Sequence, residues 1–233
     1  MKKGEWMRTS ILETSEKLFF EKGYDNTSVQ DILDRLELSK GGFYHHFPSK
    51  EAVLSEILSS HVEKGVEALK ASLEGERMSP IARMDRVLGA VNLLSDGDVS
   101  YGALMVRICY MNGDPVIRTR LRALQLDALR PLFEAAFAMG VSADAFFSRF
   151  PGRLADIVLS LVADVDDRTY MILAQQADRP EFVLEVMDEL DAGRMAVEEL
   201  LGAPYGSIQL FDPARLLECY RQAADELMRL EAR

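Results

Sequence analysis

The chain has 233 residues, 48% of them hydrophobic, and carries 27 Lys+Arg against 38 Asp+Glu, a formal net charge of −11. This length gives room for one large or two small domains with a buried core, which excludes disordered, collagen-like and disulfide-stabilised miniprotein classes. Over the whole chain, a pI near 4.8 argues against nucleic acid as a partner, because nonspecific DNA binding is chiefly phosphate neutralisation by Lys and Arg.

The two cysteines, Cys109 and Cys219, lie far apart and have no Cys or His at metal-ligand spacing beside them. The sequence therefore predicts neither a disulfide framework nor a zinc site, and two free thiols are typical of a reducing cytosol. The basic start at residues 1–6 lacks the apolar run of a signal peptide, and no stretch of about eighteen apolar residues is present. We expect a soluble, cytoplasmic protein with no membrane contact, no metal and no other cofactor.

Apolar residues recur at helical spacing along nearly the whole chain, and no run alternates between apolar and polar residues as a strand would. The sequence therefore predicts an all-α fold. The first helix ends at Lys22, and the next three cover about residues 28–36, 39–47 and 49–73. The last of these joins an N-terminal head to the rest of the chain and belongs to both. About six more helices follow, separated by Gly, Pro and Asp breaks.

Residues 27–51 contain two short helices joined by a turn of a few residues, which is the arrangement of a helix-turn-helix. Ser28 and Ser39 stand at the N-cap positions of these helices. Phe43 and Phe47 give the second helix a buried side. Two consecutive glycines in it cost roughly 1 kcal/mol each relative to Ala, which favours a helix whose backbone approaches another molecule. Its opposite side is polar or very small: Lys40, Gly41, Gly42, Tyr44 and His45.

Residues 11–24, 27–29 and 39–51 together resemble the DNA-binding domain of the tetracycline-repressor (TetR) family of bacterial transcription regulators. The resemblance covers about the first fifty residues without a gap, and the rest of the chain matches only in helix order. It implies a helix-turn-helix DNA-binding domain at residues 1–52 and a helical ligand-binding and dimerisation domain at residues 53–233. The implied function is a ligand-responsive repressor that binds a pseudo-palindromic double-stranded DNA operator as a homodimer and is released by a small molecule.

The resemblance also implies which residues face DNA. Tyr44 would donate its hydroxyl to a phosphate, and Lys50 would hold a backbone phosphate as a point charge. Base readout would depend on Gln30, Lys40 and His45, or on DNA shape. The full set of expected DNA-binding residues is Ser28, Gln30, Ser39, Lys40, Gly41, Gly42, Tyr44, His45, His46 and Lys50. The adjacent histidines point about 100° apart on a helix and have no third ligand nearby, so we expect no metal there.

In the body, the resemblance places a ligand pocket among the helices from about residue 80 to 177. Eleven methionines suit an adaptable pocket for a small-molecule effector of lipophilic or aromatic character. The helices at 152–176 and 213–229 are expected to form the dimer interface. The expected lining residues are His61, Met84, Leu88, Tyr101, Met105, Cys109, Phe133, Phe137 and Phe147.

Four charged residues interrupt the apolar pattern of the helix at 152–176: Asp164, Asp166, Asp167 and Arg168. They either contact a ligand in the pocket or form a charged rim of the dimer interface. The sequence leaves both interpretations open.

Two other classes of protein were weighed against a regulator. A helical enzyme is disfavoured, because the sequence contains no Glu-x-x-His pair, phosphate-binding loop, Gly-x-Ser-x-Gly or activated Cys/His pair. An interaction module whose head has lost DNA binding stays open because of the abundant acid. Residues 1–52, however, carry 8 basic and 9 acidic side chains, whereas residues 53–233 carry 19 and 29. The surplus acid belongs to the body, so nonspecific DNA binding is expected to be weak rather than absent.

Overall fold

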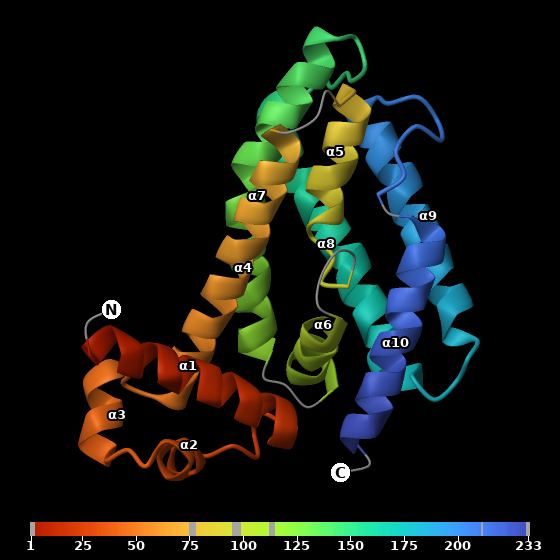
Figure 1. The fold of residues 1–233 in the computed structure, drawn as a ribbon. Helices are drawn as coiled ribbons and strands as arrows, with labels where there is room; N and C mark the ends of the chain where they lie inside the picture. Colours follow the sequence, from red (N-terminus) through yellow and green to blue (C-terminus); the bar gives the residue numbers. More distant parts are fainter. Residues whose placement is uncertain (1–2, 75–77, 95–98, 112–114, 211, 232–233) are drawn as a thin grey trace.

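The computed structural model describes residues 3–74, 78–94, 99–111, 115–210 and 212–231, and within these ranges it contains helices and no strand. The all-α prediction is confirmed. In chain order the elements are α1 (Lys3–Lys22), α2 (Val29–Leu36), α3 (Lys40–His46), α4 (Lys50–Glu74), α5 (Pro80–Gly89), α6 (Val99–Val106), the π-helical turn η1 (Arg107–Met111), α7 (Pro115–Ser142), α8 (Pro151–Gln176), α9 (Phe182–Leu201) and α10 (Pro213–Glu231). Figure 1 shows α1–α3 gathered at one end and the remaining helices rising from them.

The boundaries of the short N-terminal helices follow from local sequence. The Ser28 side chain accepts the Asp31 backbone N–H at 3.1 Å, and the Asp31 carboxylate accepts the Ser28 backbone N–H at 2.8 Å, so the capping box forms. The Ser39 side chain likewise accepts the Gly42 backbone N–H at 3.1 Å and starts α3. Gly23 ends α1 with a φ of +84°, the left-handed conformation expected there.

A single apolar core joins the head to part of the body. It contains Phe19, Ile32, Phe43 and Phe47 from the first three helices and the nearby cap, each at most 2% exposed. The same cluster continues into α6, η1 and α7 through Leu104, Met105, Ile108, Cys109 and Leu121. The head is therefore packed against the body, and the domain boundary at residues 52/53 stays a prediction.

Helix α4 is the main element common to head and body. Its 25 residues make it about 37 Å long at 1.5 Å per residue. Val53 and Leu54 near its start are buried in the head core, whereas Leu69 and Leu73 near its end are buried in a separate core with α5, α7 and α8. Figure 1 shows α4 leaving the head and running beside α7.

A third core holds α10 against α6, α8 and α9. Helices α8 and α10 begin at Pro151 and Pro213, within one residue of the expected starts. Within the described ranges, every helix is too short or too polar to span a bilayer.

Candidate nucleic-acid interface and central cavity

Helix α3 has one buried side and one exposed side, as the sequence predicts. Phe43 is fully buried, whereas Tyr44 is 53% exposed. Lys40 and His45 are exposed as well, and His46 is half-buried. In the part of the chain that the structure describes, no carboxylate or carbonyl binds the Lys40 ammonium. This exposed side of α3 can therefore contact another molecule.

The two glycines of α3 have different surroundings. A Cβ atom on Gly41 would have no heavy atom within 4 Å, so this position faces open space. A Cβ atom on Gly42 would lie 2.7 Å from Leu38 Cδ1 and 3.4 Å from Ser39 Oγ. Gly42 is thus placed against the turn between α2 and α3. Its small size has a packing reason that the sequence pattern did not reveal, and Gly41 is the position open to a partner.

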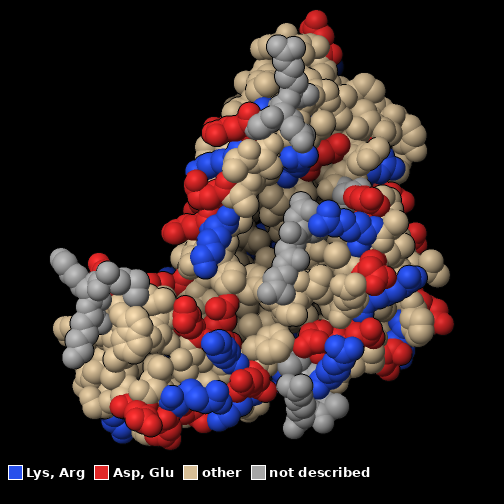
Figure 2. Space-filling view, viewed as in Figure 1, with Lys and Arg blue, Asp and Glu red and all other residues tan. Residues whose placement is uncertain are grey.

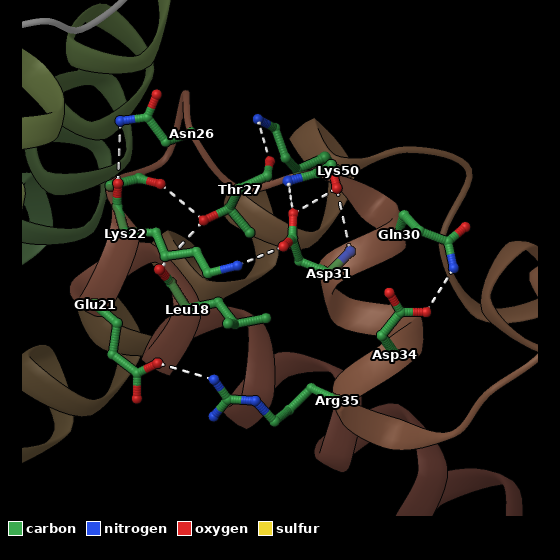
Figure 3. A network of polar contacts seen from close by, with 12 residues as sticks. Leu18, Glu21, Lys22, Asn26, Thr27, Gln30, Asp31, Asp34, Arg35 and Lys50 are labelled. Carbon is green, nitrogen blue, oxygen red and sulfur yellow. Dashed lines mark hydrogen bonds and ion pairs between the residues drawn. The ribbon is translucent and has the colours of Figure 1, made fainter.

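Helices α1 and α2 are joined by ion pairs that neutralise part of the head's positive charge (Figure 3). Lys22 pairs with Asp31, and Arg35 Nη2 lies 3.0 Å from Glu21 Oε2. The Lys22 ammonium and the Ser28 hydroxyl hold the pKa of the Asp31 carboxyl well below its ordinary value.

The expected DNA-binding residue Gln30 is exposed on α2, and its amide is already engaged (Figure 3). Its Nε2 donates to Asp34 Oδ1 at 2.7 Å. A glutamine amide has a second N–H and a carbonyl oxygen, so Gln30 keeps groups that can contact a base edge.

Lys50 lies at the first turn of α4, as expected, and its ammonium is bonded within the head. Its ammonium donates to the carbonyl oxygens of Tyr24 at 2.7 Å and Thr27 at 2.8 Å, and it lies 4.1 Å from the centroid of the Tyr24 ring. It is half-buried, and Figure 3 shows it beside Thr27. The α1–α2 turn thus binds two of the three donors of the ammonium, and phosphate binding by Lys50 stays a prediction.

Replacing Lys50 with Met should destabilise the chain by about 1–3 kcal/mol, because two carbonyl groups lose a charged donor. Urea denaturation followed by circular dichroism would measure this loss. Lys40→Met is the matched control, since Lys40 is exposed, and should change the stability by less than about 0.5 kcal/mol. Equal stability of the two variants would contradict the role assigned to Lys50.

His45 and His46 pack edge to face, with ring centroids 5.1 Å apart. The described residues contain no group of three His, Cys, Asp or Glu side chains that could hold a metal ion. His45 and His46 can thus form hydrogen bonds at the α3 surface and are not part of a described cluster of metal ligands.

A cavity of about 810 Å³ lies in the body between α4, α5, α6, α7 and α10. Its volume is within the range of small-molecule binding sites, about 300–1,000 Å³. Figure 2 shows the corresponding hollow near the middle of this face of the molecule. The lining residues are His61, Val62, Lys64, Gly65, Val66, Ala68, Leu69, Ser72, Arg86, Ala90, Asn92, Leu93, Tyr101, Leu121, Gln125, Leu129 and Arg215.

Two of the nine expected pocket residues, His61 and Tyr101, line this cavity. Phe147 is 69% exposed between α7 and α8. Cys109 is buried among apolar neighbours, which raises the pKa of its thiol to about 12. The other seven do not line this cavity, because apolar side chains at helical spacing mostly fill helix–helix contacts here, and their contact with a ligand stays a prediction. Those buried in core clusters away from the cavity wall are Met84, Leu88, Met105, Cys109, Phe133 and Phe137.

His61 connects the cavity wall to the head. Its ring stacks on Tyr101 with centroids 3.8 Å apart, and its Nε2 lies 2.6 Å from Glu16 Oε1 on α1. The hydrogen bond from His61 lowers the pKa of the Glu16 carboxyl. A molecule in the cavity can thus touch a side chain that is bonded to the first helix of the head.

The charged residues that interrupt α8 bind other helices of the same chain. Arg122 on α7 lies 2.6 Å from Asp164 and 3.1 Å from Asp167, and Arg168 lies 2.6 Å from Glu189 on α9. None of the four lines the central cavity in the described structure. Neither pocket contacts nor a dimer rim is needed to explain Asp164, Asp167 and Arg168.

Asp166 lies directly behind the cavity wall. It is 5% exposed, and its Oδ1 accepts from Asn92 Nδ2, 2.8 Å away, while Asn92 itself lines the cavity. Burial raises the pKa of the Asp166 carboxyl from 3.8 to about 7. The folded chain therefore binds a proton at Asp166 more tightly than the unfolded chain does.

Because the folded pKa of Asp166 is the higher one, its contribution to stability is present below pH 4 and is lost as the pH rises toward about 7. Asp166→Asn should remove this loss, so its stability relative to the unmodified chain should rise by about 2–3 kcal/mol between pH 5 and pH 8. Denaturation of both proteins across this pH range would measure the difference. Parallel stability curves for Asp166→Asn and the unmodified chain would contradict this.

The sequence model described as bacterial regulatory proteins, tetR family, matches residues 11–57, which hold α2, α3 and the adjoining parts of α1 and α4. The chain is 32% identical over 91 residues to the HTH-type transcriptional repressor DhaR of Mycobacterium sp. (strain GP1), covering 39% of this chain and 46% of that protein. The N-terminal part of the chain therefore matches the tetR family of bacterial regulatory proteins.

A second curated relative matches a shorter segment of the chain. An uncharacterized HTH-type transcriptional regulator of Bacillus subtilis (strain 168), YuxN, is 52% identical over 54 residues, 23% of this chain and 19% of that protein. The chain thus covers less than half the length of either curated relative. Both relatives are named as transcriptional regulators rather than as enzymes.

Solved structures extend the likeness in fold to the body of the chain. A TetR-family regulator from Pectobacterium atrosepticum has a TM-score of 0.63 at 18% identity, covering 86% of this chain and 97% of that one. The regulator FadR from Bacillus subtilis, in complex with stearoyl-CoA, has a TM-score of 0.57 at 14% identity, covering 79% and 96%.

Proposed function

We propose that this tetR-family protein is a ligand-responsive DNA-binding repressor of transcription in the cytoplasm. It binds a pseudo-palindromic operator as a homodimer and is released when a small molecule enters the central cavity. The course of α4 carries this proposal. Val53 and Leu54 fix the helix in the head core, and the same helix lines the cavity from His61 to Ser72. A ligand therefore contacts the element on which the DNA-binding head is built.

The exposed side of α3 supports operator binding. Lys40, Tyr44 and His45 project from a seven-residue helix whose other side is anchored by Phe43. A helix presented in this way can enter a major groove, with Lys40 and Tyr44 on phosphates and His45 on a base edge. Ser28 and Ser39, which cap α2 and α3, are exposed beside them. The repressor name of DhaR favours repression over activation.

The head provides few unpaired cations for phosphate contacts. Arg8 pairs with Glu56, and Lys22, Arg35 and Lys50 are engaged within the head. Electrostatic binding to arbitrary DNA should therefore be weak, and affinity should depend on two heads engaging one operator.

Exposed apolar residues on α8 and α9 support dimerisation through these helices. Ile157 and Met171 on α8 are 48% and 42% exposed, and Leu184 and Met195 on α9 are 67% and 50% exposed. Large apolar side chains on a surface favour contact with another protein. In contrast, α10 turns most of its apolar side chains, such as Tyr220, into its own chain's core, although Met228 is 39% exposed. We therefore propose α9 in place of α10 as the partner of α8.

Selection of genomic DNA fragments by the purified full-length chain, followed by gel shift and light scattering, tests the proposed function. We expect enrichment of a pseudo-palindromic site that is bound by two copies of the chain. The half-sites should lie about one helical turn apart or a multiple of it, at 34–36 Å per turn. A folded protein that enriches no such site would leave only an interaction module without DNA binding, and the repressor proposal would be rejected.

A further inference from the structure

The central cavity differs in charge from the rest of the molecule. Lys64 from α4, Arg86 from α5 and Arg215 from α10 border it, and its described lining contains no Asp or Glu. Over the whole chain the balance is the reverse, with 38 acidic against 27 basic residues. Basic residues from three separate helices thus meet at one cavity of a chain that is acidic overall.

The basic and apolar parts of the lining occupy different places. Lys64, Arg86 and Arg215 are all exposed, so they lie where the cavity opens to solvent. In Figure 2, Lys and Arg side chains border the hollow. Among the apolar lining residues, Leu69, Leu121 and Leu129 are buried and Val62, Val66 and Leu93 are half-buried.

We propose that this cavity binds an amphipathic organic anion, with its carboxylate or phosphate group at Lys64, Arg86 and Arg215 and its apolar chain or ring among the leucines. The inference rests on the proposed function, because it takes this cavity as the effector site. An acid group can form charge-assisted hydrogen bonds with guanidinium and ammonium groups there, while the apolar part leaves water.

The contacts within the chain are compatible with such a ligand. Arg86 Nη1 donates to the Ser72 carbonyl oxygen at 3.4 Å. A guanidinium carries five N–H donors, so an arginine that is bonded within the chain can also bind an acid group. Tyr101, Asn92 and Gln125 are half-buried and supply neutral polar groups to the wall. A cationic ligand would find no carboxylate in the described lining, and a neutral one would gain only the apolar and neutral hydrogen-bond contributions.

Calorimetric titration of the full-length chain without DNA tests the charge of the ligand. The probes are decanoate, decyl phosphate, decan-1-ol and decyltrimethylammonium, each below its micelle concentration. We expect one molecule of either anion to bind per chain, about tenfold or more tightly than the alcohol or the ammonium, which corresponds to about 1.4 kcal/mol. The ratio between the two anions separates preference for a carboxylate from preference for a phosphate.

Variants assign the effect to the cavity. Replacing Lys64, Arg86 and Arg215 together with Met should weaken anion binding about tenfold or more and change decan-1-ol binding by less than about threefold. Each single substitution is measured as well, so the role of each basic residue can still be tested if the triple variant does not fold. Arg149→Met is the matched control, because Arg149 is exposed between α7 and α8, away from the cavity.

Three results would overturn the inference: equal binding of the anions and the ammonium, full anion affinity in the substituted chains, or no saturable binding of either anion. Because the calorimetric titration contains no DNA, such a result would not change the outcome of the operator selection that tests the proposed function. Conversely, a chain that binds the anions and enriches no operator would remove the proposed function and keep the anion site.

Discussion

Gly41→Glu should weaken operator binding by about 100-fold or more while the chain stays folded. Position 41 faces open space, so a longer side chain meets no atom of the protein within 4 Å of its Cβ. Glu is a better helix former than Gly by about 0.5–1 kcal/mol, and an acid in the first turn of a helix is favourable. If α3 enters the major groove, however, the added carboxylate meets phosphates and acceptor groups of the bases, and such like-charge contacts cost several kcal/mol.

The matched control for Gly41→Glu is Gly41→Gln, which has nearly the same size and no charge. It should retain more binding than the Glu variant, and the gap should shrink as salt is added, because screening weakens the repulsion. Gel shifts at two or three ionic strengths measure this, with circular dichroism as the check on folding. Unchanged operator affinity in both variants would show that this side of α3 does not face DNA.

The head could be predicted from sequence because its determinants are local. The caps at Ser28 and Ser39 and the left-handed Gly23 act within a few residues, and the Phe43 and Phe47 spacing defines one side of α3 without further information. Each of these features is also found in the structure.

Lys50 and Gly42 show where local patterns stop being informative. The Lys50 ammonium binds carbonyl oxygens 26 and 23 residues earlier in the chain, at Tyr24 and Thr27. Gly42 is small because Leu38 occupies the space that its Cβ would need. Both facts depend on how the chain turns in three dimensions, so helix periodicity could not distinguish a phosphate-binding lysine from a turn-binding one.

The cavity was the least predictable part of the molecule. Phe133 and Phe137 are of the residue type expected in a pocket, yet they are core residues. Lys64, Arg86 and Arg215 are of a type common on any protein surface, yet they border the cavity. These three basic residues come from helices far apart in the sequence. Only the packing of α4, α5 and α10 brings them together, and no spacing rule within one helix could find them.

The contact between His61 and Glu16 suggests how occupancy of the cavity reaches the head. His61 lines the cavity, stacks on Tyr101 and bonds to Glu16, which lies on the helix that packs against α2 and α4. Displacement of His61 by a ligand would break or shift this bond and change the position of α1 relative to α4. A ligand that changes affinity at a second site does so through a coupling free energy, typically 1–3 kcal/mol or about 5- to 150-fold.

Glu16→Leu should therefore remove most of the response to ligand while leaving operator affinity without ligand within about threefold. With decanoate as the probe, the ratio of operator affinities without and with ligand should fall from within the 5- to 150-fold range to about two or less. Glu13→Leu is the control, because Glu13 is exposed on the same helix, and it should keep the full ratio. Binding coupling is reciprocal, so in the Glu16 variant the decanoate affinity should also become nearly the same with and without operator. A Glu16→Leu protein that responds to decanoate as strongly as the Glu13 control would show that the cavity signals to the head along another route, with the continuous helix α4 as the remaining connection.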